Sequence, residues 1–360
     1  MIIEQNKILE YLKAKKPLVD DKVKEIIEKR RPYLSNINAF ADDGLNRLSE
    51  FCNKGKSLRG ILTILGAEMY GLEQNDALIE LGAIIEIIHS SILIQDDIQD
   101  EDNMRRGFPS VFYQYQLIAS YQNFKNPKFY GQSIAMDVYL IGHYLAMNAL
   151  ADLNISSDLK IKILSFLSSE IMKVGVAQSQ DIYHAYVQAD KISIADIENV
   201  HLYKTGRYTL SMPLMLGGIF SGKLIEDMKQ IEEASEILGL VFQIKDDELS
   251  IFAEEEELGK KVGNDIIENK KTHFRELLYQ RVSDSEKRIL KTSFGNKNLN
   301  FKKVQKIREL LIKYNVQEDI QGKMDMIGAK AMSIIDEVSI DQSRKELLYS
   351  LINYLLHRTK

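Results

Sequence analysis

The chain has 360 residues, of which 45% are hydrophobic and 28% are charged, and it contains one cysteine. A chain this long and this apolar can bury a core, which excludes a disordered protein. The single Cys52 excludes a disulfide framework and a cysteine-built metal site, and a net charge of −5 gives no support to nucleic-acid binding.

The first predicted element is a helix near the start of the chain. The opening MIIEQNKILEYLKAKK contains acidic residues and has no uninterrupted apolar segment before a cleavage site. We therefore expect no signal peptide and a cytoplasmic protein. Residues Asp21–Arg30 place their apolar side chains on one face and their charges on the other, which predicts a helix.

Two later apolar segments share a pattern. Ala83–Asp100 (AIIEIIHSSILIQDDIQD) and Ile237–Ser250 (ILGLVFQIKDDELS) are mostly apolar, and each ends near a pair of aspartates. A helix that is apolar on nearly every face is buried, so we expect these helices to deliver carboxylates to the bottom and rim of a cavity. The longest apolar run, Ala83–Ile94, is interrupted by Glu86 and His89 and is too short for a membrane span.

Helical patterns dominate the remaining sequence, and alternating strand-like segments are scarce. Ser283 and Glu286 have the spacing of a capping box, which predicts another helix start. With only 5 prolines, the chain is predicted to form one all-α domain over residues 1–360. Residues 1–40 would be its helical N-terminal extension and residues 280–360 its helical C-terminal tail. The clearest predicted loops are residues 123–128, 253–264 and 295–300.

The first aspartate pair belongs to a DDxxD motif. Asp96, Asp97 and Asp100 lie within one helical turn, and Asp96 and Asp100 share a face. Carboxylates this close repel one another, and a hard divalent cation such as Mg²⁺ relieves the repulsion. Arg105 and Arg106 follow at once, and arginines beside metal carboxylates suit a polyanion such as diphosphate. The alternative for an isolated DDxxD is a solvated acidic helix end.

The second aspartate pair and several basic residues are weaker signals when taken alone. Asp246 and Asp247 repeat the acidic arrangement, and across a cavity they could complete a multi-metal clamp on one diphosphate. Lys56 and Arg59 in GKSLRG lie at a predicted helix start, where free amides also attract anions. The motif YKT and the segment GKKVGNDIIENKKT add further lysines. Each basic residue alone would be read as a solvated surface charge, so their joint occurrence carries the signal.

His89 has two interpretations. A lone histidine in an apolar helix is usually a core residue with a satisfied ring. However, His89 precedes Asp96 by seven residues, two turns away on nearly the same face, so it could face a phosphate.

Together these motifs resemble the trans-isoprenyl diphosphate synthases, the polyprenyl synthetase family. GKSLRG, EIIHSSILIQDDIQDEDNMRRG, AQSQD, YKTG, FQIKDDELS and GKKVGNDIIENKKT occur in the family's order over roughly residues 45 to 275. The resemblance implies an isoprenoid synthase-type helical bundle around a central cavity. It also implies a homodimer and an active site with three Mg²⁺ ions.

The resemblance implies a role for each matching residue. Asp96 and Asp100, supported by Asp97, would hold Mg²⁺ against the allylic diphosphate, and Asp246 would hold a further ion. Lys270 would help to neutralise the diphosphate region, and Phe242 would face the isopentenyl group. The residues expected to contact the allylic substrate are Arg105, Lys204, Thr205, Gln243 and Lys260. Those expected to bind the diphosphate of isopentenyl diphosphate are Lys56, Arg59, His89 and Arg106.

The sequence departs from the family pattern at three places. Ser250 stands where the second acidic motif has its last aspartate, and Ala177 stands in the glycine position of the motif that reads AQSQD here. An insertion occupies about residues 120–128. The first departure bears on metal affinity and not on the reaction class.

The implied reaction is Mg²⁺-dependent head-to-tail condensation of isopentenyl diphosphate with dimethylallyl, geranyl or farnesyl diphosphate. A terpene cyclase is the nearest rival enzyme, but it binds no second diphosphate and would not need the Lys56 and Arg59 pair. A non-catalytic partner subunit is a second rival, although such a subunit would be expected to lose the first acidic motif.

The predicted product length rests on the helix that ends at Asp96. Ile92 and Ile88 form a column below Asp96, and Ser91 borders it. Short-chain members of the family place bulky aromatics at the fourth or fifth position before the motif, where this chain has Ile92 and Ser91. We therefore predict a C20 or longer product, with geranylgeranyl diphosphate as the best single choice. The alternative is that Ser91 faces a neighbouring helix and that another helix forms the floor of the pocket that receives the growing prenyl chain.

Overall fold

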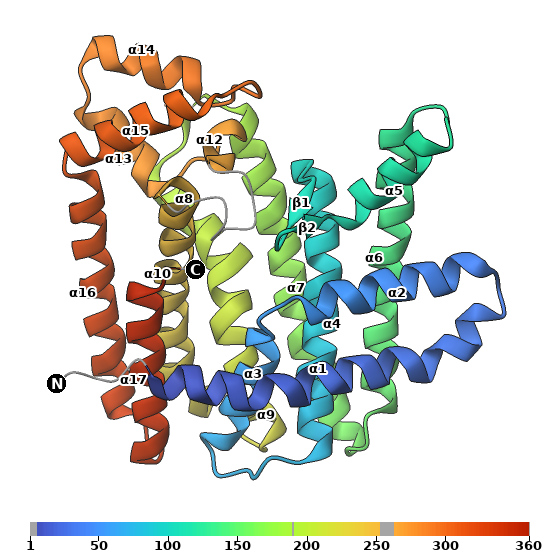
Figure 1. The fold of residues 1–360 in the computed structure, drawn as a ribbon. Helices are drawn as coiled ribbons and strands as arrows, with labels where there is room; N and C mark the ends of the chain where they lie inside the picture. The colour runs from blue at the N-terminus through green and yellow to red at the C-terminus, as the bar shows by residue number, and fades with distance from the viewer. Residues whose placement is uncertain (1–5, 189–190, 253–262, 360) are drawn as a thin grey trace. The chain divides into compact units, whose positions relative to one another are not determined.

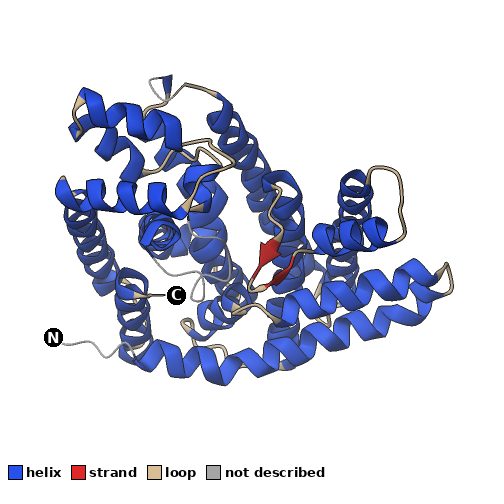
Figure 2. Cartoon of the chain, turned by 45° about the horizontal axis from the view of Figure 1, so that its top comes forward, coloured by secondary structure: helices blue, strands red, loops and turns tan. Residues whose placement is uncertain are grey.

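The computed structural model describes residues 6–188, 191–252 and 263–359, which are almost entirely helical (Figure 1). Within these residues the only strands are β1 (Met104–Arg105) and β2 (Phe108–Pro109), a short antiparallel pair drawn red in Figure 2. The predicted all-α class is therefore confirmed. The helices are α1 (Asn6–Ser35), α2 (Ala39–Asn53), α3 (Leu58–Glu68), α4 (Asp76–Asp100), α5 (Val111–Tyr121), α6 (Pro127–Asp152), α7 (Ser157–Tyr186), α8 (Ile194–Val200), the π-helical segment η2 (His201–Ser211), α9 (Met212–Phe220), the 3₁₀ turn η3 (Ile225–Met228), α10 (Lys229–Phe252), α12 (Asn264–Ile267), α13 (His273–Arg281), α14 (Asp284–Ser293), α15 (Phe301–Lys313), α16 (Val316–Glu337) and α17 (Gln342–His357).

The predicted capping box is confirmed, and so are the loops predicted at residues 123–128 and 295–300, except that α6 already begins at Pro127. The side-chain oxygen of Ser283 accepts from Glu286 N at 3.4 Å, and the Glu286 carboxylate accepts from Ser283 N at 3.1 Å, so α14 begins with a capping box. Irregular backbone joins α5 to α6 and α14 to α15, at two of the predicted loops. The third predicted loop lies almost wholly at 253–262, outside the described residues.

The chain folds into two compact units. The α4 unit comprises Leu9–Phe166 and Pro213–Ile225, and the α10 unit comprises Leu167–Met212, Glu226–Lys360 and the residues up to Ile8. The prediction of one domain concerns the chain as a whole and stays a prediction.

Helix α4 is the central element of its unit. It begins after Asn75, whose side chain accepts a hydrogen bond from Leu78 N at 3.0 Å, and it ends at Asp100, where the next residue, Glu101, has a left-handed φ of 57°. Its apolar side chains are buried against α3 and α6. A Cβ at Gly60 of α3 would lie 2.6 Å from the carbonyl oxygen of Gly82, so α3 and α4 approach each other through glycine backbones.

Helix α2 runs back along α1 in the same unit (Figure 1). Arg31 of α1 donates to Asp42 of α2 at 3.1 Å and to Asn46 at 3.0 Å. Cys52, near the end of α2, is buried, and burial raises the pKa of its thiol to about 12. The thiol is therefore protonated at neutral pH.

The α10 unit is built around the contact of α10 with η2 and α16. A π-helix is rare and is frequently found at functional sites, and η2 contains the predicted YKT motif. Buried Arg207 of η2 donates through Nε and Nη2 to Glu170 of α7, both at 3.0 Å, and also pairs with Glu232 of α10 at 2.7 Å. This ion-pair network fixes η2 between two long helices.

Two helices of the described chain, α4 and α6, are long and apolar enough to cross a membrane by length and composition. The sequence analysis considered only the apolar run Ala83–Ile94, which is shorter than the full helix α4. The most apolar window of α4 is 72% buried inside the protein, as expected of a core helix, and that of α6 is 39% buried. These two helices are thus weak evidence for a membrane span.

Candidate active site

The first acidic motif lies in the last turn of α4. Asp97 is fully buried, whereas the side chain of Asp96 is 18% exposed. Arg105 of β1 donates from Nε to Asp97 at 2.5 Å, and its Nη2 lies 3.4 Å from Asp96 and 3.3 Å from Asp102. Burial alone would lower the pKa of Arg105, but these three carboxylates raise it above its ordinary value. Arg105 and the DDxxD motif thus form one buried charge cluster, while the expected contact of Arg105 with the allylic diphosphate stays a prediction.

A strained turn holds Arg106 beside this cluster. Arg106 has a left-handed φ of 55°, and Gly107 follows at 77°. The Arg106 guanidinium donates to the Phe51 carbonyl at 2.9 Å. A Cβ at Gly55 would lie 2.9 Å from Arg106 Nη1, so the first glycine of GKSLRG leaves room for the guanidinium. Residues from two distant motifs thus meet at one place.

His89 and Arg59 form the next contact along α4. Arg59 Nη1 lies 2.8 Å from His89 Nε2, and because a guanidinium can only donate, the ring nitrogen accepts. Burial, followed by the charges of Arg59 and Arg106, lowers the pKa of His89 well below its ordinary value, so the ring is neutral. Glu86, one turn earlier, accepts from Gly60 N at 2.7 Å and tethers the start of α3. The structure therefore groups Arg59, His89 and Arg106, while Lys56 is exposed in the loop before α3.

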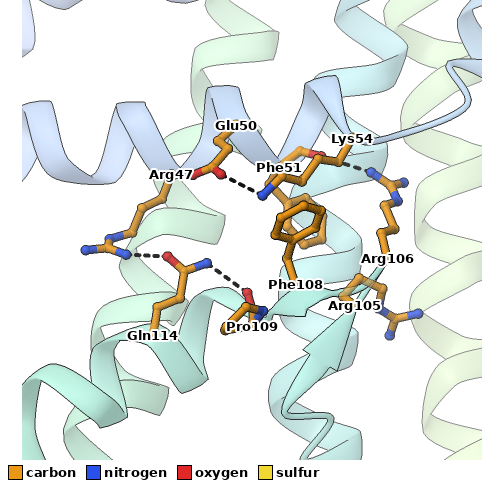
Figure 3. Close-up of a pocket in the computed structure, with 9 residues that line it drawn as sticks. All are labelled: Arg47, Glu50, Phe51, Lys54, Arg105, Arg106, Phe108, Pro109 and Gln114. Atoms are coloured by element: carbon orange, nitrogen blue, oxygen red, sulfur yellow. Dashed lines mark hydrogen bonds and ion pairs between the residues drawn. The ribbon is translucent and has the colours of Figure 1, made fainter. Parts of the chain in front are cut away.

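A small pocket that is open to solvent lies beside the Arg105–Arg106 hairpin (Figure 3). It contains two basic residues that the sequence analysis missed, Arg47 and Lys54 of α2. Lys54 Nζ lies 3.3 Å from the centroid of the Phe108 ring. Arg47 and Lys54 are seven residues apart, which places them two turns apart on one face of α2. This spacing is the sequence signal that could have identified them. The complete lining is Arg47, Glu50, Phe51, Lys54, Arg105, Arg106, Phe108, Pro109 and Gln114.

The second acidic motif lies on α10, in the other unit. Asp247 is buried and accepts from Gln243 Nε2 at 2.8 Å. Burial, then the charges of Asp265 and Asp246, raises the pKa of Asp247 well above its ordinary value. The side chain of Asp246 is 41% exposed. Accumulated negative charge of this kind fits a site that receives a cation.

A histidine that the sequence analysis left unassigned supports Asp247. His201 Nε2, at the start of η2, lies 3.6 Å from an Asp247 oxygen. Burial and the neighbouring His273 lower the pKa of His201 to about 3, so its ring is neutral at physiological pH. We therefore read this contact as polar packing and not as an ion pair.

Other predicted residues of the α10 unit lie near this motif, since the charge of Lys270 acts on Asp247 and that of Lys204 acts on His201. Lys204 Nζ pairs with Asp181 of the AQSQD motif at 2.6 Å, and the adjacent Thr205 is half-buried. Lys270 Nζ lies 2.8 Å from Glu268 and 3.8 Å from Asp265. Phe242 is half-buried on α10. Lys260 lies outside the described residues.

The predicted chain-length residues are all on α4. Ile88 and Ser91 are buried, and Ile92 is half-buried. The Ser91 hydroxyl donates to the Ile87 carbonyl at 2.8 Å. A Cβ at Gly142 of α6 would overlap the Ser91 oxygen, so Ser91 packs against a neighbouring helix. That is the alternative placement that the sequence analysis left open for Ser91.

Known proteins share this sequence pattern and this fold. The family model for polyprenyl synthetase matches residues 45–311. Geranylgeranyl diphosphate synthase of Sulfolobus acidocaldarius is 28% identical over 74% of this chain and 76% of its own length. Geranylfarnesyl diphosphate synthase of Aeropyrum pernix is 26% identical over 91% of this chain and 98% of its own.

Solved structures agree on the fold. A geranylgeranyl pyrophosphate synthase from Corynebacterium glutamicum, complexed with isoprenyl diphosphate and magnesium, has a TM-score of 0.89. It is 23% identical and covers 96% of this chain and 98% of its own. A farnesyl diphosphate synthase of T. brucei, complexed with risedronate, has a TM-score of 0.80 at 19% identity, over 97% of this chain and 100% of its own.

Proposed function

This chain belongs to the polyprenyl synthetase family of prenyltransferases, and we propose that it joins isopentenyl diphosphate to an allylic prenyl diphosphate. The proposed primers are dimethylallyl, geranyl and farnesyl diphosphate. The proposed products are a trans-polyprenyl diphosphate of C20 or longer and free diphosphate. The observation that carries the proposal is the buried cluster of Asp96, Asp97 and Arg105, with Arg59, His89 and Arg106 also in the α4 unit.

We propose Asp96, Asp100 and Asp246 as ligands of Mg²⁺, with three ions in each active site. All three donors are carboxylate oxygens, which hard divalent cations prefer. The surroundings of Asp247 support this assignment, because Asp265 and Asp246 place negative charge beside it that a cation would offset. Two structural relatives carry a divalent metal with isoprenyl diphosphate: the C. glutamicum synthase with magnesium, and a Caulobacter crescentus polyprenyl synthase with calcium.

The proposed chemistry needs no protein nucleophile. Bound Mg²⁺ would offset the charge that develops on the departing diphosphate. Arg105 and Lys204 would bind the allylic diphosphate and favour ionisation of its C–O bond. Arg59, His89 and Arg106 would hold isopentenyl diphosphate so that its double bond attacks the allylic cation. The proton then lost would pass to the released diphosphate, and the apolar side chains of α4 would exclude water.

We propose geranylgeranyl diphosphate as the product. Ile88 and Ile92 continue the column below Asp96 and carry no aromatic ring that would end a pocket early. Relatives named for C20 and longer products, in S. acidocaldarius and A. pernix, support this length.

We also propose a cytoplasmic homodimer that forms through α6. Phe129, Met136, Leu140 and Tyr144 are 43–66% exposed and recur at intervals of seven and four residues, which places them on one face of the helix. A second copy of the chain would cover this apolar face. Sedimentation analysis of the protein and of Leu140→Lys tests the proposal, since the variant should dissociate.

The decisive experiment incubates the protein with Mg²⁺, isopentenyl diphosphate and each allylic primer in turn, followed by chromatography of the products. We expect products of C20 or longer and loss of activity when EDTA removes the metal. Products that stop at C15 with isopentenyl diphosphate in excess would contradict the length. A cyclic hydrocarbon formed without consumption of isopentenyl diphosphate would instead favour a terpene cyclase.

A further inference from the structure

Asp246 of the second acidic motif is in contact with an arginine from far along the chain. Arg358, which follows α17, donates through Nη2 to the Asp246 carboxylate and to the Phe242 carbonyl, the latter at 3.1 Å. The guanidinium carbon lies 4.3 Å from the centroid of the Phe242 ring. The side chain of Arg358 is only 6% exposed. A carboxylate, a carbonyl and an aromatic ring therefore hold this guanidinium in place.

Asp246 is the accessible carboxylate of this motif. It is 41% exposed, whereas Asp247 is buried and is contacted by Gln243 and His201. The last position of the motif is Ser250, which brings no charge. A cation that approaches the motif would therefore use Asp246, the carboxylate that Arg358 contacts.

We propose that Arg358 is a positioning residue that competes with the metal ion for Asp246, so that Asp246 binds metal only when diphosphate is also present. This inference rests on the proposed function of the same site. A metal ion alone must displace the guanidinium and leave a buried positive charge without its counter-ion, which is costly. Diphosphate brings negative charge and strong acceptors for a guanidinium. The exchange then becomes favourable, and metal and substrate arrive together.

A double-variant cycle tests this competition. The probe is Mn²⁺, whose free form is measured by electron paramagnetic resonance, with and without inorganic diphosphate. In the natural protein, Asp246→Asn should change Mn²⁺ affinity by less than about twofold without diphosphate and weaken it about tenfold with diphosphate. In the Arg358→Gln protein, Asp246→Asn should weaken Mn²⁺ binding about tenfold under both conditions.

Two further variants separate competition from a structural role. Arg358→Lys keeps the charge and should behave like the natural protein in the cycle. Arg281→Gln is the matched control, because Arg281 pairs with Asp319 at 2.6 Å on the surface and should leave Mn²⁺ binding unchanged. Circular dichroism shows whether each variant folds. If Arg358→Gln does not fold, the Mn²⁺ affinities of Asp246→Asn and of the natural protein, each measured with and without diphosphate, still test the competition.

The inference is overturned if Asp246→Asn weakens Mn²⁺ binding equally with and without diphosphate while Arg358 is present. Prenyl transfer is assayed in parallel on the natural protein. Prenyl transfer together with a diphosphate-independent effect of Asp246→Asn refutes the competition alone. Absence of both prenyl transfer and diphosphate-dependent Mn²⁺ binding refutes the proposed function itself.

Discussion

Gly239→Ala is expected to force apart the two helices that organise the α10 unit. A Cβ at position 239 of α10 would lie 2.6 Å from the carbonyl carbon and 2.8 Å from the carbonyl oxygen of Gly206 in η2, and closer still to its Cα. Carbon atoms in good contact are about 3.5–4.0 Å apart, so the helices must separate by more than about 1 Å. The obstacle is backbone, which cannot rotate away as a side chain can.

The cost follows from this geometry. Overpacking a tight contact costs about 1–3 kcal/mol, and we expect the upper end because backbone must move. For an unfolding unit of about 150–250 residues, the size range of the α10 unit, 1 kcal/mol corresponds to about 2–4 °C, so the melting temperature of this unit should fall by about 6–12 °C. The turnover number should also fall, because α10 carries Gln243 and Asp247 one and two turns after Gly239, and η2 carries Lys204.

Thermal unfolding by circular dichroism and steady-state prenyl transfer measure these two effects. Gly322→Ala in α16 is the matched control, because no atom outside the surrounding turns of its own helix lies within 4 Å of its Cβ position. It should stabilise the protein by about 0.5–1 kcal/mol, since glycine in a helix interior is less favourable than alanine. If Gly239→Ala unfolds at the temperature of the natural protein, the contact between α10 and η2 is not as tight as described.

Four other changes test separate parts of the molecule. Arg207→Met should cost about 3–5 kcal/mol by leaving Glu170 buried with too little positive charge. Burial raises the pKa of Glu170, but Arg207 and Lys173 lower it below its ordinary value. Glu170 therefore stabilises the natural fold above its unfolded pKa, and this contribution is lost as the pH falls. The Arg207→Met variant should consequently lose less at pH 4 than at pH 7 in urea unfolding, and adding Glu170→Gln should restore part of the loss at pH 7; an equal loss at both pH values would count against the network. Asp96→Ala should lower the turnover number by about 10²-fold or more with little change in unfolding temperature; near-normal turnover at saturating Mg²⁺ would show that Asp96 is not a metal ligand. Arg59→Ala should raise the KM for isopentenyl diphosphate more than that for the primer, and equal increases would argue against two separate diphosphate sites. Ile88→Ala should lengthen the product, which chromatography of the dephosphorylated alcohols detects; an unchanged length would mean that another side chain sets the floor.

Features encoded by local spacing were predictable from the sequence. The i,i+4 relation of Asp96 and Asp100 places both aspartates in the last turn of one helix, and the structure ends α4 at Asp100. The capping box at Ser283 depends on residues only three apart, and it forms as predicted. Arg105 follows the motif closely enough that a tight hairpin returns it to Asp97.

Features that depend on distant segments were not predictable. Arg358 and Asp246 are 112 residues apart, and no local pattern relates them. The π-helical geometry of η2 was not predicted either, because its residues carry an ordinary helical pattern. Its register depends on the packing of Gly206 against Gly239, which is distant in the sequence. Such contacts become visible only when the elements are placed in space.

The lone buried thiol offers a natural reporter on the motion of this region. Cys52 follows Phe51, whose carbonyl binds Arg106. The carbonyl of Cys52 accepts a hydrogen bond from the backbone N–H of Gly55 at 3.0 Å. Because the side chain of Cys52 is buried, a thiol-modifying reagent can reach it only when the end of α2 opens. Its raised pKa also keeps the thiol protonated and therefore unreactive while the segment is closed. The modification rate therefore measures the opening equilibrium of the segment that leads into GKSLRG. A ligand that tightens this corner would slow the labelling of a cysteine that it never touches.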